Sequence, residues 1–315
     1  MQTIGASPEH LCGVLGIERP VLGAPMAKIS GGVLAAAVSN AGGLGFVGGG
    51  YGDPEWIERE ISLVGHSLFG IGLITWNMAK GALATVLSHR PDAVWLSFGD
   101  SQPHIGAIKT ARALAVCQVG TVAEAIDAAE AGADVIVAQG SEAGGHGRLG
   151  ETLSELLPAI SMAVPETPLV AAGGINDRDD LAAVQALGAA GVALGSALYA
   201  THEALDVDEA KRLIVRSDGA DTIRSTVYDI VRGPQWPAGY VGRSIRTNLT
   251  DQWAGREIEL QDAKEPLTIR HRQAAADADV SFRVVWAGEG IGGIDQIRLA
   301  AEIIRRFPKI RRTTP

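Results

Sequence analysis

Short apolar segments alternate with longer alanine-rich segments through the first two thirds of the chain. The apolar segments have the length of strands, and we expect eight of them: 21–26, 44–47, 70–76, 93–98, 113–119, 134–139, 169–172 and 191–194. Helices are expected to follow them, beginning near Gly32, Glu55, Leu83, Gln102, Thr121, Ser154, Asp177 and Ala204. Uninterrupted apolar strands that alternate with helices are typical of a parallel sheet covered on both faces. Eight such units predict an α/β fold, a closed (β/α)8 TIM barrel, rather than an open sheet.

The alternation stops after about residue 203. Residues 206–283 have a polar, helical pattern, whereas strand-like and glycine-rich sequence returns at 282–293, and an amphipathic helix is expected at 295–307. The simplest interpretation is that residues 1–203 and 284–315 form the barrel. Residues 204–283 would then be inserted in it as a mainly helical cap, which has the size of a small domain.

The aromatic residues of the expected cap can pack in a core or line a pocket, and the pattern does not decide between the two: Tyr228, Trp236, Tyr240 and Trp253. Pro234 and Pro237 flank Trp236, which predicts a rigid loop around this ring.

Composition and charge narrow the classes of function. With 46% apolar and 20% charged residues, the chain is not disordered, and its net charge of −9 without a basic stripe argues against a nucleic-acid surface. The basic residues near the end are expected at a solvated helix end: Arg305, Arg306, Lys309, Arg311 and Arg312. No apolar run reaches the ~18 residues that a membrane span needs, so we expect a cytoplasmic protein without a membrane partner.

Two cysteines, Cys12 and Cys117, are too few for a disulfide framework and too isolated for a metal site. Cys117 lies in an apolar run, and we expect it to be a buried thiol. No H-E-x-x-H helix or paired C-x-x-C is present, so no metal is expected, and no Walker loop supports an NTPase.

The segment 138–148, A-Q-G-S-E-A-G-G-H-G-R, is rich in groups that can carry chemistry. It directly follows an expected strand, and barrel enzymes place their reacting groups at the carboxyl ends of strands. Four glycines leave the backbone of this expected loop bare, and His146 has no large neighbour in the sequence to bury it. His146 is therefore a candidate general base near pH 7, the alternative being a surface histidine in a loop. His202, after the eighth strand, is a weaker second candidate.

Glycine turns follow the seventh and eighth strands. Ala172-Gly173-Gly174 ends one and Gly195-Ser196 ends the other. Turns in these two places form the recurrent phosphate site of such barrels, although each pair alone is also compatible with a plain turn.

Two strings match the dinucleotide pattern G-x-G-x-x-G, at 43–48 and 288–293. The first follows a helix and is filled by strand residues, and the second leaves too little chain to complete a βαβ unit. We interpret neither as a dinucleotide site.

The chain resembles the nitronate monooxygenases, formerly 2-nitropropane dioxygenases, among the FMN-dependent flavin oxidoreductases. The resemblance covers most of the chain and rests on these segments: 24–26 (A-P-M), 42–45 (G-G-L-G), 48–51 (G-G-G-Y), 69–70 (F-G), 139–146 (Q-G-S-E-A-G-G-H), 172–175 (A-G-G-I), 186–189 (A-L-G-A), 195–196 (G-S) and 287–291 (A-G-E-G-I).

The resemblance implies a set of site residues. His146 would be the catalytic base. The residues implied to bind FMN are Ala24, Pro25 and Met26 along the flavin ring, Gln139 at its polar edge, and Gly145, Ala172, Gly173, Gly174, Gly195 and Ser196, the last four at the phosphate.

Three positions depart from the family pattern as the resemblance presents it. Gly72 stands where the family commonly has Asn, Ser196 where it commonly has Thr, and Gly147-Arg148 reverses an Arg-Gly order. Serine keeps the hydroxyl group. The departure at Gly72 bears on the substrate more than on the flavin.

The resemblance implies oxidation of alkyl nitronates or nitroalkanes with dioxygen to carbonyl compounds and nitrite. The alternative is an NAD(P)H-dependent FMN oxidoreductase, a quinone or enoyl reductase, because flavin-dependent enoyl reductases carry a very similar loop. A third possibility is a barrel that binds a phosphate ligand without turnover. The sequence leaves the physiological substrate, NAD(P)H as a partner and self-association open.

Overall fold

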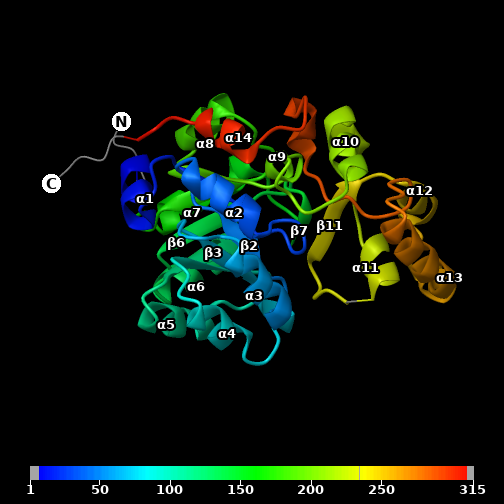
Figure 1. Cartoon of the computed structure of the whole chain (residues 1–315), viewed down its shortest axis with the longest axis horizontal. Helices are drawn as coiled ribbons and strands as arrows, with labels where there is room; N and C mark the ends of the chain where they lie inside the picture. The colour runs from blue at the N-terminus through cyan, green and yellow to red at the C-terminus, as the bar shows by residue number, and fades with distance from the viewer. Residues whose placement is uncertain (1–6, 234, 311–315) are drawn as a thin grey trace.

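The computed structural model describes residues 7–233 and 235–310 of the chain. Eight parallel strands form one sheet in the order β1-β9-β8-β6-β5-β4-β3-β2. Their bounds are β1 (Val21–Gly23), β2 (Phe46–Gly48), β3 (Gly70–Ile74), β4 (Ala93–Ser97), β5 (Leu114–Val119), β6 (Val135–Gln139), β8 (Leu169–Ala172) and β9 (Gly191–Leu194). A parallel bridge between Leu22 and Leu44 joins the two edges of the sheet. The TIM barrel predicted from the alternation of strands and helices is confirmed (Figure 1).

Helices follow the strands around the outside of the barrel. They are α2 (Gly32–Asn40), α3 (Pro54–Ser62), α4 (Ala82–Ser88), α5 (Gln102–Thr110), α6 (Val122–Glu130), α7 (Leu153–Ala163), α8 (Arg178–Ala186) and the short α9 (Ser196–Tyr199). The expected caps are present: Thr121 accepts a hydrogen bond from the Glu124 N–H at 3.1 Å, and Asp177 forms a capping box with Asp180.

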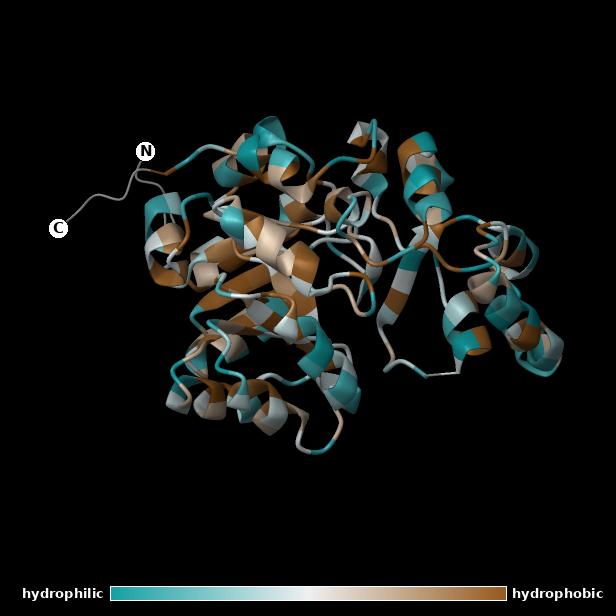
Figure 2. Ribbon diagram, viewed as in Figure 1, coloured by the Kyte–Doolittle hydropathy of each residue, from teal (hydrophilic) through white to brown (hydrophobic). Residues whose placement is uncertain are grey.

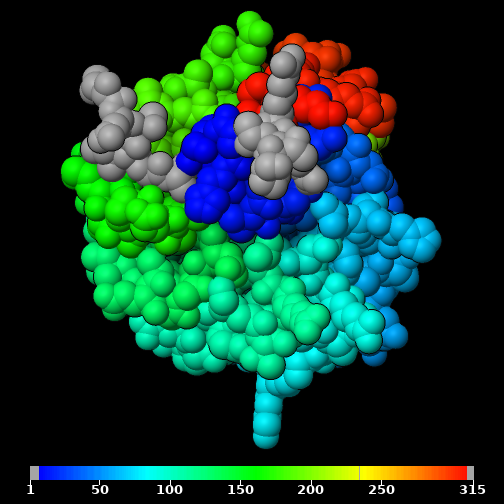
Figure 3. Space-filling model, turned by 90° about the vertical axis from the view of Figure 1, so that its left-hand side faces the viewer, coloured from blue at the N-terminus to red at the C-terminus, as the bar shows by residue number. Residues whose placement is uncertain are grey.

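One end of the barrel is plugged. Helix α1 (Pro8–Leu15), which the sequence pattern did not single out, buries Leu11 and Leu15 against the residues that fill the barrel interior, among them Phe46 and Trp95. The rings of Phe46 and Trp95 meet edge to face with centroids 5.1 Å apart. Figure 3 shows α1 in blue, lying across this end between the green, cyan and red parts of the chain. Any ligand site of the barrel is therefore left to the opposite end, where the strands finish.

A second body of structure lies beyond the other end of the barrel, on the right of Figure 1. Its elements are α10 (Asp208–Arg216), β10 (Thr222–Ser225), α11 (Val227–Arg232), β11 (Tyr240–Ile245), α12 (Asn248–Trp253) and α13 (Glu257–Ala276). Tyr228, Leu260 and Phe282 are buried in its own apolar cluster. Apolar strands lie inside the barrel, whereas α13 of the second body carries many polar residues (Figure 2).

The glycine-rich segment after β6 differs from the loop that we expected. Residues Gly145–Arg148 form a strand, β7, which pairs antiparallel with β11, and β11 pairs with β10 in a three-stranded sheet. Gly242 stands opposite His146 in this register. Since β7 comes from the barrel part of the chain, the division at residues 204–283 stays a proposal.

The last helix is shorter than the sequence pattern predicted. Helix α14 (Ala300–Arg305) begins five residues after the expected start. The backbone of Arg298 pairs instead with the segment 200–202, and the Glu203 carboxylate accepts the N–H of Ala300 at 3.0 Å, which caps the helix there. The helix expected near Ala204 likewise begins later, as α10, because Asp206 first forms a buried ion pair with Arg283. The segment 282–287 contributes a single bridge, Ser244 to Trp286, before the 3-10 turn η3 (Glu289–Gly293).

Cys117 is fully buried, as expected, and burial raises the pKa of its thiol to about 11. Among the helices in the described part of the chain, none combines the length and the apolar content that a membrane span requires.

Candidate active site

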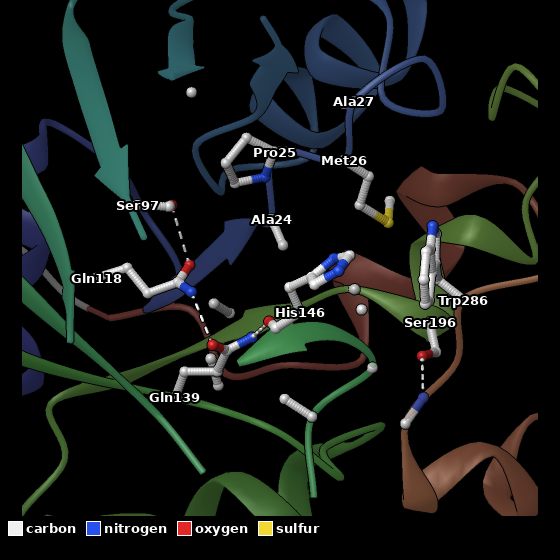
Figure 4. Close-up of a pocket in the computed structure, with 18 of the residues that line it drawn as sticks. Ala24, Pro25, Met26, Ala27, Ser97, Gln118, Gln139, His146, Ser196 and Trp286 are labelled. Carbon is white, nitrogen blue, oxygen red and sulfur yellow. Dashed lines mark hydrogen bonds between the residues drawn. The ribbon is translucent and has the colours of Figure 1, made fainter. Parts of the chain in front are cut away.

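A cavity of about 260 Å³ opens at the carboxyl ends of the barrel strands, on the side that faces the cap. Its lining includes every residue that the sequence analysis assigned to the site: Ala24, Pro25, Met26, Gln139, Gly145, His146, Ala172, Gly173, Gly174, Gly195 and Ser196. These residues come from the ends of four barrel strands and from β7, and the fold brings them together (Figure 4). Their roles remain predictions.

A line of side-chain hydrogen bonds crosses the floor of the cavity. Gln118 Oε1 accepts from Trp95 Nε1 at 3.2 Å, and Gln118 Nε2 donates to Gln139 Oε1 at 2.8 Å. Gln139 Nε2 then donates to the backbone oxygen of His146 at 2.9 Å (Figure 4). Since an indole N–H can only donate, Trp95 sets the orientation of both amides. Gln139 thus has one amide proton left for a ligand.

His146 is enclosed by rings, so the expectation that nothing large buries it was wrong. It is 8% exposed, and its ring stacks on Trp236 with centroids 3.6 Å apart and an interplanar angle of 7°. Trp286 lies 5.0 Å away at a tilt. Pairing of β7 with β11 causes this burial, because it carries His146 under the cap. Local sequence around position 146 contains no sign of these partners.

The imidazole of His146 has one polar partner. Its Nε2 lies 2.8 Å from Oδ1 of Asp229, a residue of α11 that is 7% exposed. Nδ1 forms no hydrogen bond within the described residues, and it is not among their buried polar atoms that lack a partner. His146 lines the cavity, so Nδ1 is the ring nitrogen that its hydrogen bond with Asp229 leaves free for a ligand. Asp229 is 83 residues away in the sequence, and sequence reasoning missed it.

The two glycine turns lie side by side in the cavity wall. Gly173 and Gly174 have φ of +138° and +69°, backbone conformations that favour glycine. The hydroxyl of Ser196 accepts the N–H of Gly288 at 3.0 Å, so its own proton remains free to donate. A Cβ at Gly290 would lie 2.5 Å from the oxygen of Gly174. The segment 288–290 therefore completes this wall, and our assignment of site residues left it out although the motif was visible.

Position 72 is explained by its neighbour. A Cβ at Gly72 would lie 2.2 Å from the Cβ of Pro25, far closer than two non-bonded carbon atoms can approach. Gly72 and Pro25 both line the cavity. In this chain the Pro25 ring therefore occupies the space that a larger residue at position 72 would need.

Two arginines hold the segment that leads to β7. Arg224 donates from Nε and Nη2 to the oxygen of Ser141 and from Nη2 to that of Ala143 at 3.2 Å. Arg243 donates to the same Ser141 oxygen. Burial, helped by repulsion from Arg243, lowers the pKa of Arg224 to about 10. Both arginines come from the cap sheet and were not expected from the sequence.

The cap aromatics divide between packing and the cavity. Trp236 lines the cavity, whereas Tyr228 is buried in the cap core with its hydroxyl 2.7 Å from Thr247 Oγ1. Trp253 packs against the same core, and Tyr240 packs against Phe98. Pro234, half of the expected rigid loop, lies outside the described residues, as do Arg311 and Arg312.

His202, the weaker candidate base, is exposed and is not part of the cavity lining among the described residues. His146 is thus the histidine that the fold places in the cavity.

A barrel with a cavity at the carboxyl ends of its strands has the active-site position of TIM-barrel enzymes. The profile of the nitronate monooxygenase family matches residues 8–68 and 73–308 of the chain. The match is interrupted at 69–72, the segment that ends at Gly72.

Individual relatives agree. The chain is 35% identical to the nitronate monooxygenase npaC of Metarhizium robertsii, over 90% of this chain and 88% of the relative. Its structure is similar to FabK from Thermotoga maritima, with a TM-score of 0.83, 28% identity and 94% of each chain covered. It is also similar to a nitroalkane oxidase from Streptomyces ansochromogenes, with a TM-score of 0.80, 26% identity, and 94% of this chain and 96% of the other covered.

The chain belongs to the nitronate monooxygenase family. Membership makes it an oxidoreductase that acts on a small molecule with oxygen, and it implies a flavin cofactor.

Proposed function

We propose that the protein is an FMN-dependent nitronate monooxygenase, which oxidises alkyl nitronates or nitroalkanes to carbonyl compounds and nitrite with His146 as its base. The observation that carries this proposal is the position of His146. His146 lines a cavity that the two glycine turns also line, and its Nδ1 is the ring nitrogen not bonded to Asp229.

The residues present fit a flavin mononucleotide. The turn at Gly173–Gly174 exposes backbone in a conformation that favours glycine, nothing would meet a side chain at Gly195, and Ser196 has a free hydroxyl proton. Such a group of backbone N–H donors suits one terminal phosphate. Ala24, Pro25 and Met26 would lie along the ring, and Gln139 would donate its remaining amide proton to the ring's polar edge. Gly145 and Ala172 would complete the contacts.

The flavin, when bound, supplies the redox chemistry that passes electrons from the nitronate to dioxygen. The chain's own task is to place the substrate carbon near His146 Nδ1 and to accept its proton there. Trp236 and Trp286 cover the imidazole and keep bulk water from it.

Anaerobic titration of the purified protein tests the function. We expect propionate 3-nitronate to bleach the flavin absorbance rapidly, with mass spectrometry identifying the released flavin as FMN. NADH and NADPH serve as the comparison, since the NAD(P)H-dependent alternative is not favoured by the family match. Rapid bleaching by either of them without bleaching by the nitronate would overturn the proposal.

A further inference from the structure

We propose that Asp229 is a positioning residue that forms a carboxylate–imidazole dyad with His146, holding its proton on Nε2 so that Nδ1 is the basic nitrogen. This inference rests on the proposed function for the identity of the substrate. The dyad itself rests on the geometry alone.

The contact between the two residues is close and dry. His146 Nε2 lies 2.8 Å from Asp229 Oδ1, and both side chains are more than nine-tenths buried. A carboxylate can only accept, so the shared proton sits on Nε2 and the lone pair of the neutral ring is on Nδ1. Since His146 lines the cavity and Nε2 is bonded to Asp229, Nδ1 is the nitrogen left for a substrate.

The second oxygen of Asp229 makes the carboxylate unusual. Oδ2 is buried and has no hydrogen-bond partner among the described residues. A buried carboxylate with a single partner is costly to keep in a fold, and a cationic partner reduces that cost most effectively. An imidazolium at His146 would be such a partner.

The proposed step transfers a proton from the substrate carbon to His146. The C–H bond beside the nitro group breaks, its electron pair stays with the substrate as a nitronate, and the proton forms a bond to Nδ1 of His146. Nε2–H continues to donate to Asp229 Oδ1. After the transfer, the imidazolium of His146 lies between the Asp229 carboxylate and the nitronate. Each new charge therefore has a neighbour of opposite sign.

Stacking on Trp236 completes the arrangement. The two ring centroids are 3.6 Å apart and the ring planes are nearly parallel. The indole therefore limits rotation of the imidazole away from this parallel orientation. Asp229 then determines which nitrogen of His146 carries the proton, and Trp236 fixes the orientation of the imidazole ring.

Two measurements on the flavin-loaded protein test the dyad. Long-range ¹H–¹⁵N correlation spectra of labelled protein report the tautomer of His146, whose signals are assigned by their loss in His146→Gln. We expect the Nε2–H tautomer in the wild type and a shift toward Nδ1–H in Asp229→Asn, whose amide can donate to Nε2. A wild-type Nδ1–H tautomer would overturn the proposal without use of any substrate.

The kinetic comparison uses Asp229→Asn with a matched control, Glu257→Gln, which removes a carboxylate of α13 that forms no hydrogen bond or ion pair with His146 within the described part of the chain. We expect kcat/KM for a neutral nitroalkane to fall about 10²-fold or more in Asp229→Asn. The loss on a preformed nitronate should be smaller, and Glu257→Gln should match the wild type. Equal losses on both substrate forms would contradict the dyad. A wild type inert toward both forms would contradict the proposed function, while the tautomer spectra would still decide on the dyad.

Discussion

At the scale of single residues, the site depends on positions where the backbone favours glycine. Gly72 is pressed against Pro25, and Gly174 holds a left-handed conformation next to the segment of η3. Both glycines line the cavity, so a side chain added at either position changes the cavity wall. Each can be tested through the flavin and not only through turnover.

Gly72→Asn should destabilise the protein by about 1–3 kcal/mol, because the new side chain must displace Pro25 from the cavity wall. Flavin retention should fall with it. Urea unfolding and the ratio of flavin to protein absorbance measure the two effects. Gly106→Asn is the control, since a Cβ at Gly106 meets nothing within 4 Å. Equal behaviour of the two variants would mean that Pro25 yields without cost.

Gly174→Asp should abolish flavin retention while the barrel stays folded, because a carboxylate there would repel a phosphate dianion. Gly174→Ala is the matched control, which adds the backbone strain of φ +69° without the charge. Absorbance of bound flavin beside a circular dichroism spectrum separates the two. Full FMN content in Gly174→Asp would remove this turn from the phosphate site.

At the scale of elements, the strands of the barrel were predictable and the second sheet was not. Eight apolar runs between helical segments predict eight strands, and each strand of the barrel lies within or overlaps its expected segment. Strand β7 has the sequence Gly-His-Gly-Arg, which has little strand propensity. It becomes a strand only because β11, from a distant part of the sequence, pairs with it and places Arg243 opposite Gly145.

The same non-local pairing explains what was missed in the site. The glycine turns and His146 could be found because they follow strands directly in the sequence. Asp229, Trp236 and the arginines that hold the 141–143 segment come from the cap, and nothing within their local sequence links them to position 146. Only the fold of the cap over the barrel reveals them.

Trp236 forms a wall between the cavity and a second one of about 390 Å³, since it lines both. Trp236→Ala should therefore open the site toward the cap, so that KM for longer nitroalkanes falls relative to that for nitroethane. Steady-state kinetics over a chain-length series measures this. Trp253→Ala, which removes a cap aromatic outside the cavity lining, serves as the control. An unchanged chain-length profile would show that Trp236 does not limit the substrate.

At the scale of the whole molecule, the barrel is closed by α1 at one end and faces the cap at the other, so the stability of the cap governs the site. The cap contains a titratable group that bears on this. His271 of α13 is 8% exposed, and burial, followed by repulsion from Arg232, Arg283 and Arg272, lowers its pKa to about 4. Its Nε2 has no partner among the described residues.

Acid should therefore weaken the cap through His271. Between pH 6.5 and 4 the unfolded chain binds a proton at this histidine that the folded chain does not, so its contribution to stability is lost as the pH falls. Allowing for partial solvent screening, the loss is about 1–2 kcal/mol. His271→Leu should reduce the difference between the unfolding free energies at pH 7 and pH 4.5 by that amount. An identical pH dependence in the variant would contradict the assignment.

Oxygen consumption by His146→Ala shows whether this cavity deprotonates nitroalkanes at His146. Wild type and variant are compared at matched FMN concentration on a neutral nitroalkane and on its preformed nitronate. We predict a loss of about 10²-fold or more on the neutral form and a clearly smaller loss on the nitronate, which arrives without the proton. Equal activity of variant and wild type on the neutral nitroalkane, or a wild type inert toward both forms, would contradict the account.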